Sequence, residues 1–364
     1  MGKTAAFAQA CRAASLRRRF ALLVAAMLLA APLAPSQTLI RMGTLAPKGS
    51  RWEQILLEMG AKWKQATNGR LTLRLYAGGE QGDEPEMVQK MRIRKLQSVA
   101  LSGAGLSGID ASVSALQIPL MFNSYEELDY VRDKISPRLE KLLAARGYIV
   151  LNWADAGWVR FFSRDPAYSP DDFRKLKLCV LQGDSATFEL YKNNGFHPVA
   201  LAATDILTGL QTGLIDAFQA PALVALGSQW FGGARNMLDL KLATLVGATL
   251  ISKDVWNKLS PDDQRKVMDI SRESGVELRK EIRSQEANAI GLMQSMGLNE
   301  EKISPQAAAQ WRTLIEGKLY PALRSHGMPP ALFDEVVHLR DEYRAAHSTS
   351  PARPAAKGSS KRRP

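Results

Sequence analysis

The sequence predicts an α/β fold in which mixed sheets are covered by helices. From Gln37 onward, short apolar segments typical of strands alternate with longer segments whose apolar residues follow helical spacing. A helix cap or a glycine stop stands at almost every junction between them. Strands separated by helices of this length form parallel or mixed sheets, which bind ligands at the carboxyl ends of their strands.

Capping boxes mark the starts of helices in the first half of the chain. Ser50 precedes Glu53 by three residues, and Ser124 precedes Glu127 in the same way. In such a pair the serine oxygen accepts an orphan backbone amide and the glutamate reaches back. The predicted elements are a strand at 40–42, a helix at 50–68, a strand at 71–75, a helix from 83 to about 96, a helix at 124–146 and a strand at 149–153.

The second half continues the alternation and ends in helices. A helix opens at Asp184 or Ser185 and stops at Gly195, while Ser260 caps an unusually long helical pattern from Pro261 to about Met296. The remaining predicted elements are strands at 175–180 and 215–219 and helices at 204–212, 305–325 and 330–347.

The two ends of the chain differ from its body. Residues 1–36 are typical of a secretory signal, with a basic start, an apolar stretch from Phe20 to Ala34 and a cleavage point before Gln37. An uncleaved membrane anchor is the alternative, although the stretch is short for a bilayer span. Residues 348–364 are rich in Pro, Ser and Ala, and are predicted to be a disordered basic tail. We therefore expect a mature protein of an envelope compartment that is not inserted in the membrane.

Most of the formal net charge of +12 lies at the two ends. Residues 1–36 carry +5 and residues 348–364 carry another +5, which leaves +2 for the body. A nucleic-acid-binding protein places its basic residues on the folded domain. The sequence therefore predicts no nucleic-acid partner.

Residues that commonly carry catalysis are sparse. Cys11 belongs to the predicted signal, so Cys179 is the one cysteine of the mature chain, and as a nucleophile it would need a histidine partner. The nearest histidine in sequence, His197, follows a helix, and no HExxH, GxSxG, Walker loop or CxxC motif occurs. We predict that the protein is not an enzyme and binds no cofactor or metal; a secreted α/β enzyme is the alternative.

Several segments match a family pattern in order and spacing. "PDDFRKLKLCV" (170–180) is similar to "pEDLkGlKiRv", and Thr204, Leu210–Gly213 and Asp216 match "fsEvYtALqtGvvDGqEn". "YAGGEQGDEPEMVQKMR" (76–92) and "IPLMF" (118–122) match two further motifs. The chain thus resembles the solute-binding subunits of tripartite ATP-independent periplasmic (TRAP) transporters, the DctP-like family, from about residue 37 to 347.

The resemblance implies a two-lobed periplasmic solute-binding fold crossed by one long helix. Lobe I would comprise 37–155 and about 245–285; lobe II, with the C-terminal helices, would comprise 156–244 and about 286–347. The lobes would close on a small organic ligand and deliver it to membrane permease subunits. A receptor that presents its ligand to a sensor kinase is the alternative within this fold.

The family's ligand-binding arginine falls on Cys179, which removes one bidentate carboxylate anchor. The family's acidic metal ligand falls on Gln219, a poor ligand for a hard cation. An arginine between aromatics can bind an anion, so Arg160 is predicted to contact any acidic group of a ligand that is not a simple C4-dicarboxylate. The predicted ligand-binding residues are Trp52, Glu84, Trp153, Asp155, Trp158, Arg160, Cys179, Gln182, Gln219 and Trp230.

Overall fold

The computed structural model describes residues 37–347, so the predicted signal and tail lie outside the described residues. From Leu39 onward the chain forms one compact unit. Its strands are β1 (Thr38–Thr44), β2 (Leu71–Tyr76), β3 (Ser98–Ser102), β4 (Tyr148–Ser163), β5 (Lys177–Leu181), β6 (His197–Leu201), β7 (Ala217–Pro221), β8 (Asn236–Leu238), β9 (Ala243–Ser252) and β10 (Asn299–Glu301).

Helices connect nearly all of these strands. They are α2 (Arg51–Ala66), α3 (Glu84–Arg92), α4 (Gly103–Ser107), α5 (Tyr125–Ala145), α6 (Pro170–Phe173), α7 (Ser185–Asn193), α8 (Ile206–Thr212), α9 (Ala222–Gly227), α10 (Lys253–Trp256), α11 (Pro261–Ser295), α12 (Pro305–Leu314), α13 (Tyr320–Ala322) and α14 (Pro330–His347). The predicted helix at 305–325 is a longer run in which π-helical turns flank α13. Between residues 37 and 347, no helix combines the length and the apolar composition that a bilayer span needs.

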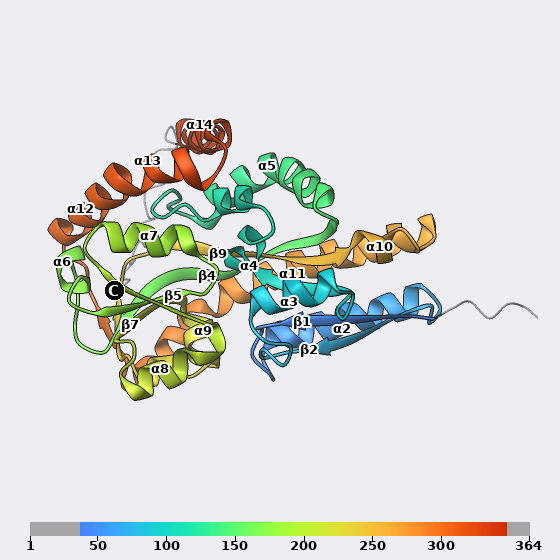
Figure 1. Ribbon diagram of the computed structural model, residues 1–364, viewed down its shortest axis with the longest axis horizontal. Helices are drawn as coiled ribbons and strands as arrows, with labels where there is room; N and C mark the ends of the chain where they lie inside the picture. The colour runs from blue at the N-terminus through green and yellow to red at the C-terminus, as the bar shows by residue number, and fades with distance from the viewer. Residues whose placement is uncertain (1–36, 348–364) are drawn as a thin grey trace, which may run out of the picture. The chain divides into compact units, whose positions relative to one another are not determined.

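The ten described strands form one sheet. It contains parallel and antiparallel strands, which agrees with the mixed sheets that the sequence predicts. Its order is β2-β1-β3-β9-β4-β7-β5-β6, with β8 and β10 attached beside β4. β1 with β3 and β5 with β6 and β7 run parallel, whereas β4 and β9 run antiparallel to their neighbours. Figure 1 shows α2 and α3 beside β1 and β2, while α7, α8 and α9 lie around β5 and β7. The two groups of parallel strands are therefore joined through β4 and β9.

β4 is much longer than the predicted strand at 149–153. Its ladder with β9 continues through register shifts between Val150 and Asn152 and between Asp155 and Trp158. Gly157 lies in the second shift with φ 101°, a backbone conformation that glycine adopts readily. The sequence suggests a turn there because Asp155 and Gly157 interrupt the apolar alternation, but a bulge absorbs both residues within one strand.

The predicted caps are confirmed where both partners are local. The hydroxyl of Ser50 accepts a hydrogen bond from the Glu53 amide at 3.2 Å, and that of Ser124 accepts one from the Glu127 amide at 3.2 Å. Ser260 caps α11 through the Asp263 amide at 3.1 Å. Asp83 stands at the N-cap of α3 but makes no side-chain cap bond, because its carboxylate is used elsewhere.

The long predicted helix is confirmed as α11, which has 35 residues. It packs along β4, α2 and α9, so it contacts a helix beside each group of parallel strands. Gly275 allows the close approach, since a Cβ there would lie 2.7 Å from the Cβ of Asn152 on β4. A helix and a strand thus cross together between the two halves of the unit.

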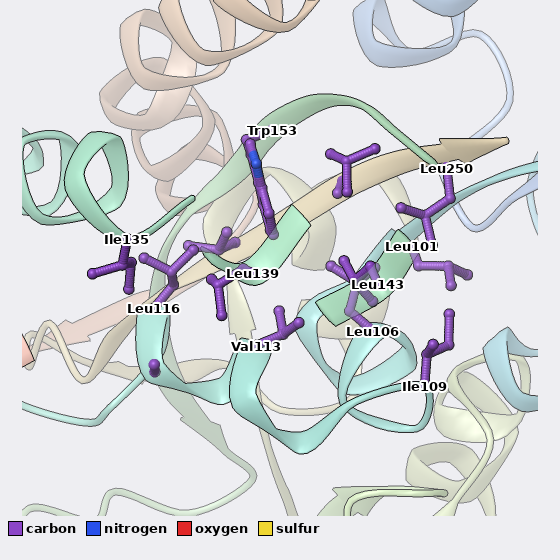
Figure 2. Close-up of a cluster of buried hydrophobic side chains, with 14 of the residues drawn as sticks. Leu101, Leu106, Ile109, Val113, Leu116, Ile135, Leu139, Leu143, Trp153 and Leu250 are labelled. Atoms are coloured by element: carbon purple, nitrogen blue, oxygen red, sulfur yellow. The ribbon is translucent and has the colours of Figure 1, made fainter. Parts of the chain in front are cut away.

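Buried apolar residues form separate clusters on the two sides of this crossing. One cluster lies among α4, α5, β3 and β9, and Figure 2 shows Trp153 of β4 pointing into it beside Leu116 and Leu139. Another surrounds β7, α8 and α9. The cluster of α5 also holds Trp158, Met328, Leu332 and Val336, which the prediction assigns to lobe II. The exact boundaries stay a prediction.

Candidate ligand-binding site

A cavity of about 850 Å³ lies where the carboxyl ends of the parallel strands meet. Thr44 and Leu45 from the end of β1 and Ser102 from the end of β3 line one wall. Cys179 from β5 and Gln219 from β7 line the other wall. Open α/β sheets bind ligands at this position, because the loops that follow the strands converge there and supply side chains of different types.

The two walls touch each other beside the cavity. The Asp83 carboxylate accepts a hydrogen bond from the Ala203 amide at 3.2 Å, and burial raises the pKa of this carboxyl. Gly79 approaches Thr204 so closely that a Cβ at residue 79 would lie 2.8 Å from the Thr204 methyl. These contacts join segments that are more than a hundred residues apart in the sequence. The two walls of the cavity are therefore in contact with each other.

We expect Gly79→Ala to weaken ligand binding at least about tenfold, equivalent to about 1.4 kcal/mol. Gly79 has φ 77°, and the added methyl would press the two walls apart. Gly69→Ala is the matched control, because Gly69 has φ 79° but no atom within 4 Å of the new Cβ. Both variants should lose about 1 kcal/mol of folding stability to the left-handed backbone. Calorimetry and urea unfolding separate the two effects; equal affinity in the two variants would show that this contact does not matter for binding.

Glu84 is the most deeply buried carboxylate of the cavity wall, 5% exposed. One oxygen accepts a hydrogen bond from the Ser102 amide at 2.5 Å, and the other accepts bonds from the Ser102 hydroxyl at 2.6 Å and the Gly105 amide at 3.0 Å. Burial raises the pKa of Glu84, while the Ser102 hydrogen bonds act against the rise. Gly105 permits this approach, because a Cβ there would lie 2.8 Å from the carboxylate.

Positive charge is scarce around the cavity. Lys48 lines it, but its ammonium pairs with Glu80 and its side chain is 60% exposed. No arginine lines the cavity among the side chains that the structure describes between residues 37 and 347. Asp184 adds a second carboxylate, which caps α7 by accepting the Thr187 amide at 3.1 Å. The fixed charges that face a ligand are therefore mainly negative.

Apart from Asp184, the wall formed by β5, β7 and their loops presents aromatic and uncharged side chains. The amide of Gln219 donates to the hydroxyl of Tyr191, and both residues line the cavity. Trp230 also lines it, and its ring packs edge-on against Phe218 with centroids 5.5 Å apart. Cys179 belongs to the same buried cluster as Phe218 and Trp230, and burial raises the pKa of its thiol to about 12. A thiol with that pKa stays protonated at neutral pH and is a poor nucleophile.

Five of the ten predicted site residues line the cavity, and five do not. The lining residues are Trp52, Glu84, Cys179, Gln219 and Trp230. The others lie elsewhere in the fold: Trp153, Asp155, Trp158 and Arg160 on β4, and Gln182 on an exposed loop. Trp153 belongs to the core and donates its indole N–H to Glu140 at 3.0 Å.

The charged residues of β4 are bound to α11. The Arg283 guanidinium donates to Asp155 at 2.6 Å and to Asp129 of α5 at 2.6 Å. The Arg160 guanidinium donates to Glu286 and to the Trp158 carbonyl, the latter at 3.2 Å. Arg160 is thus used inside the protein, and its position gives no access to a ligand in the cavity.

Sequence reasoning overlooked several lining residues. Thr244 lies on β9, a strand rich in Ala, Thr and Gly that lacks a clear alternation of apolar side chains. Its buried hydroxyl lines the cavity and has no hydrogen-bond partner among the described residues. Tyr191 falls within the predicted helix that stops at Gly195, and Asp184 is predicted only as the cap of that helix. Their position in the sequence could have indicated a role in the site, because the loop after β5 leads directly into α7.

Metal ligands do not gather in the described part of the chain. Between residues 37 and 347, no group of three or more His, Cys, Asp or Glu side chains is arranged to hold a metal ion. The carboxylates of the cavity, Glu84 and Asp184, lie on opposite walls and each is occupied by backbone amides. The geometry supports a cavity for an organic solute.

Comparison with known proteins points to one family. The sequence profile of "Bacterial extracellular solute-binding protein, family 7" matches residues 42–321. The 2,3-diketo-L-gulonate-binding periplasmic protein YiaO of Escherichia coli (strain K12) is 23% identical, over 65% of this chain and 72% of that protein. The sialic acid-binding periplasmic protein SiaP of Vibrio cholerae is 22% identical, over 72% of this chain and 82% of that protein.

Solved structures show the same fold. A TRAP periplasmic solute-binding protein from Citrobacter koseri with bound D-glucuronate has a TM-score of 0.75 and 24% identity, covering 82% of this chain and 99% of that one. The sugar acid binding protein of Advenella mimigardefordensis in complex with galactonate has a TM-score of 0.79 and 17% identity, covering 84% and 99%. The two-lobed fold with its long crossing helix is therefore confirmed.

Proposed function

The chain belongs to the bacterial extracellular solute-binding proteins of family 7, the solute-binding subunits of TRAP transporters, and we propose that it is a periplasmic receptor for a small organic solute. In this proposal the two walls close on the solute, and the closed form delivers it to membrane permease subunits. Membership of a family of ligand receptors supports binding without chemical conversion.

The observation that carries the proposal is the cavity between touching walls. Its volume of about 850 Å³ falls in the range of small-molecule sites, about 300–1,000 Å³. The contacts of Asp83 with Ala203 and of Gly79 with Thr204 couple one wall to the other. A solute that contacts both walls would stabilise the closed arrangement by its differential affinity for it.

Simple C4-dicarboxylates are poor candidates for this cavity. They carry two negative charges and are held best by guanidinium groups, which form bidentate pairs with carboxylates. Cys179 stands where the family pattern has an arginine, and the Lys48 ammonium already pairs with Glu80. Trp52, Trp230 and Tyr191 favour a larger and partly apolar solute.

A solute screen with two readouts tests the proposal. A ligand at 100 times its dissociation constant should add about 2.7 kcal/mol of stability, which a thermal-shift assay detects. Small-angle scattering should then report a more compact protein with the same ligand, and the ligand should be recovered unchanged. A compound that is turned over would identify an enzyme; compaction without transport by reconstituted permease subunits would favour the sensor role.

Export is part of the proposed function. We expect the exported protein to begin near Gln37, because the apolar stretch from Phe20 to Ala34 is too short for a comfortable span. N-terminal sequencing of protein released from the periplasm checks this. Intact Met1 in a membrane fraction would show that the segment is an anchor.

A further inference from the structure

The charges around the cavity do not suit an acid. Glu84 is buried in its wall and forms no ion pair among the described residues, while Asp184 adds a second carboxylate on the opposite wall. The lysine of the wall is neutralised by Glu80. A buried charge is normally paired, because desolvation is costly without a partner. The cavity wall therefore carries two carboxylates against one lysine among the described residues, and that lysine already pairs with Glu80.

The other feature that attracts anions is also occupied. The N-terminus of α7 faces the cavity through Ser185 and Thr187, and helix N-termini favour negative groups. Here the Asp184 carboxylate accepts a hydrogen bond from the Thr187 amide at 3.1 Å, so a negative group already lies at the N-terminus of α7. A ligand carboxylate at this end of α7 would meet a like charge.

Arg160 gives no alternative anchor for an acid. Its guanidinium is 5% exposed, lies outside the cavity and donates to Glu286 and Trp158. The relatives with solved complexes bind D-glucuronate, galactonate and orotic acid, all of which are acids. This chain has their fold, and no arginine lines its cavity among the side chains described between residues 37 and 347.

Glu84 still has capacity to bind a donor. A carboxylate offers about four acceptor positions, and the Ser102 amide, the Ser102 hydroxyl and the Gly105 amide use three of them. Thr244 lines the same cavity with a buried hydroxyl that lacks a partner in the described residues. A ligand with an N–H or O–H group could use the free acceptor position of Glu84.

We propose that the cavity takes a solute without a carboxylate group, uncharged or cationic, whose N–H or O–H donor binds Glu84. This inference rests on the proposed receptor function and names the chemical class of its ligand. Amides, lactams, polyols and amines share the required donor chemistry. Trp52 and Trp230 supply apolar faces for the remainder of the molecule.

Matched sets of probes test the inference in a thermal-shift screen of the mature protein, followed by calorimetry. Each set keeps one carbon skeleton and varies one group, such as D-glucuronate with D-glucuronamide, D-galactonate with its lactone, and cyclohexanecarboxylate with its amide and amine. We expect the hits to be the amides, the hydroxyl-bearing lactone or the amine, each at least tenfold tighter than the matching acid. An acid that binds more tightly than its partners overturns the inference but leaves the receptor function in place. No hit in any set overturns both.

A pair of variants then tests whether Glu84 binds the donor group of the ligand. Glu84→Gln should weaken the best hit at least tenfold, because it removes the charge that accepts the donor. Glu86→Gln is the control, since Glu86 is exposed on the same helix and should change affinity less than twofold. Unchanged affinity in a folded Glu84→Gln protein overturns the role of Glu84. If that variant does not fold, the charge class of the hits on the unmodified protein still decides the proposal.

Discussion

Arg160→Ala is expected to destabilise the protein by about 3–5 kcal/mol, the usual cost of removing one partner of a buried ion pair. Arg160 and Glu286 have side chains only 6% and 11% exposed, and they join β4 to α11 beside the bulge at Gly157. Without the guanidinium, the Glu286 carboxylate keeps only the Tyr125 hydroxyl, which donates to it at 2.7 Å. Urea unfolding should show a lower midpoint with an unchanged slope.

An exposed pair provides the control for this result. Arg312 of α12 pairs with Glu316 of the π-helical turn that follows, and the Arg312 side chain is 61% exposed, so Arg312→Ala should cost less than about 1 kcal/mol. The double variant Arg160→Met with Glu286→Gln should recover most of the loss, because no unpaired charge remains buried. Equal losses in Arg160→Ala and Arg312→Ala would contradict the structural role of Arg160. A large loss of ligand affinity in folded Arg160→Ala protein would instead support the expectation that it contacts the ligand.

Local features of the fold were predictable from the sequence. The serine caps at Ser50, Ser124 and Ser260 depend on residues three positions away, so a short window contains the whole interaction. The length of α11 follows from one sustained apolar period between a cap and a stop. β9 was missed because its small residues pack centrally in the sheet without a strong alternation.

The site was predictable only where residues stand at strand ends. Cys179 and Gln219 lie in parallel strands, each two residues before the carboxyl end, and such ends converge whatever the distant sequence is. The sequence predicts that Arg160 contacts the ligand because no local pattern indicates its partner in the protein. That partner, Glu286, lies 126 residues further along the chain. Patterns of residue type show that a charge needs a partner, but pairing across the fold decides whether a ligand or the protein provides it.

Cys179→Arg is expected to weaken the native ligand at least a hundredfold, about 2.7 kcal/mol. Cys179 is buried among Phe218, Trp230 and Leu210, so the new cation would enter an apolar wall and fill part of the cavity. Without a bound anion, its burial is costly. The same variant should gain affinity for an acid such as D-glucuronate, since a charge-assisted hydrogen bond contributes about 1.5–3 kcal/mol.

Cys179→Ala separates the effect of charge from that of the lost thiol. It removes one sulfur atom from the wall and should change the affinity of the native ligand less than about fivefold, or about 1 kcal/mol. Calorimetry of both variants with the native ligand and with D-glucuronate gives four measurements: Cys179→Arg should lose affinity for the native ligand and gain it for D-glucuronate, while Cys179→Ala should change little. If Cys179→Arg binds the native ligand as tightly as Cys179→Ala does, the residue does not face the ligand. If the unmodified protein binds succinate or malate tightly, the cavity accepts acids without a guanidinium, and the charge argument from its wall is wrong.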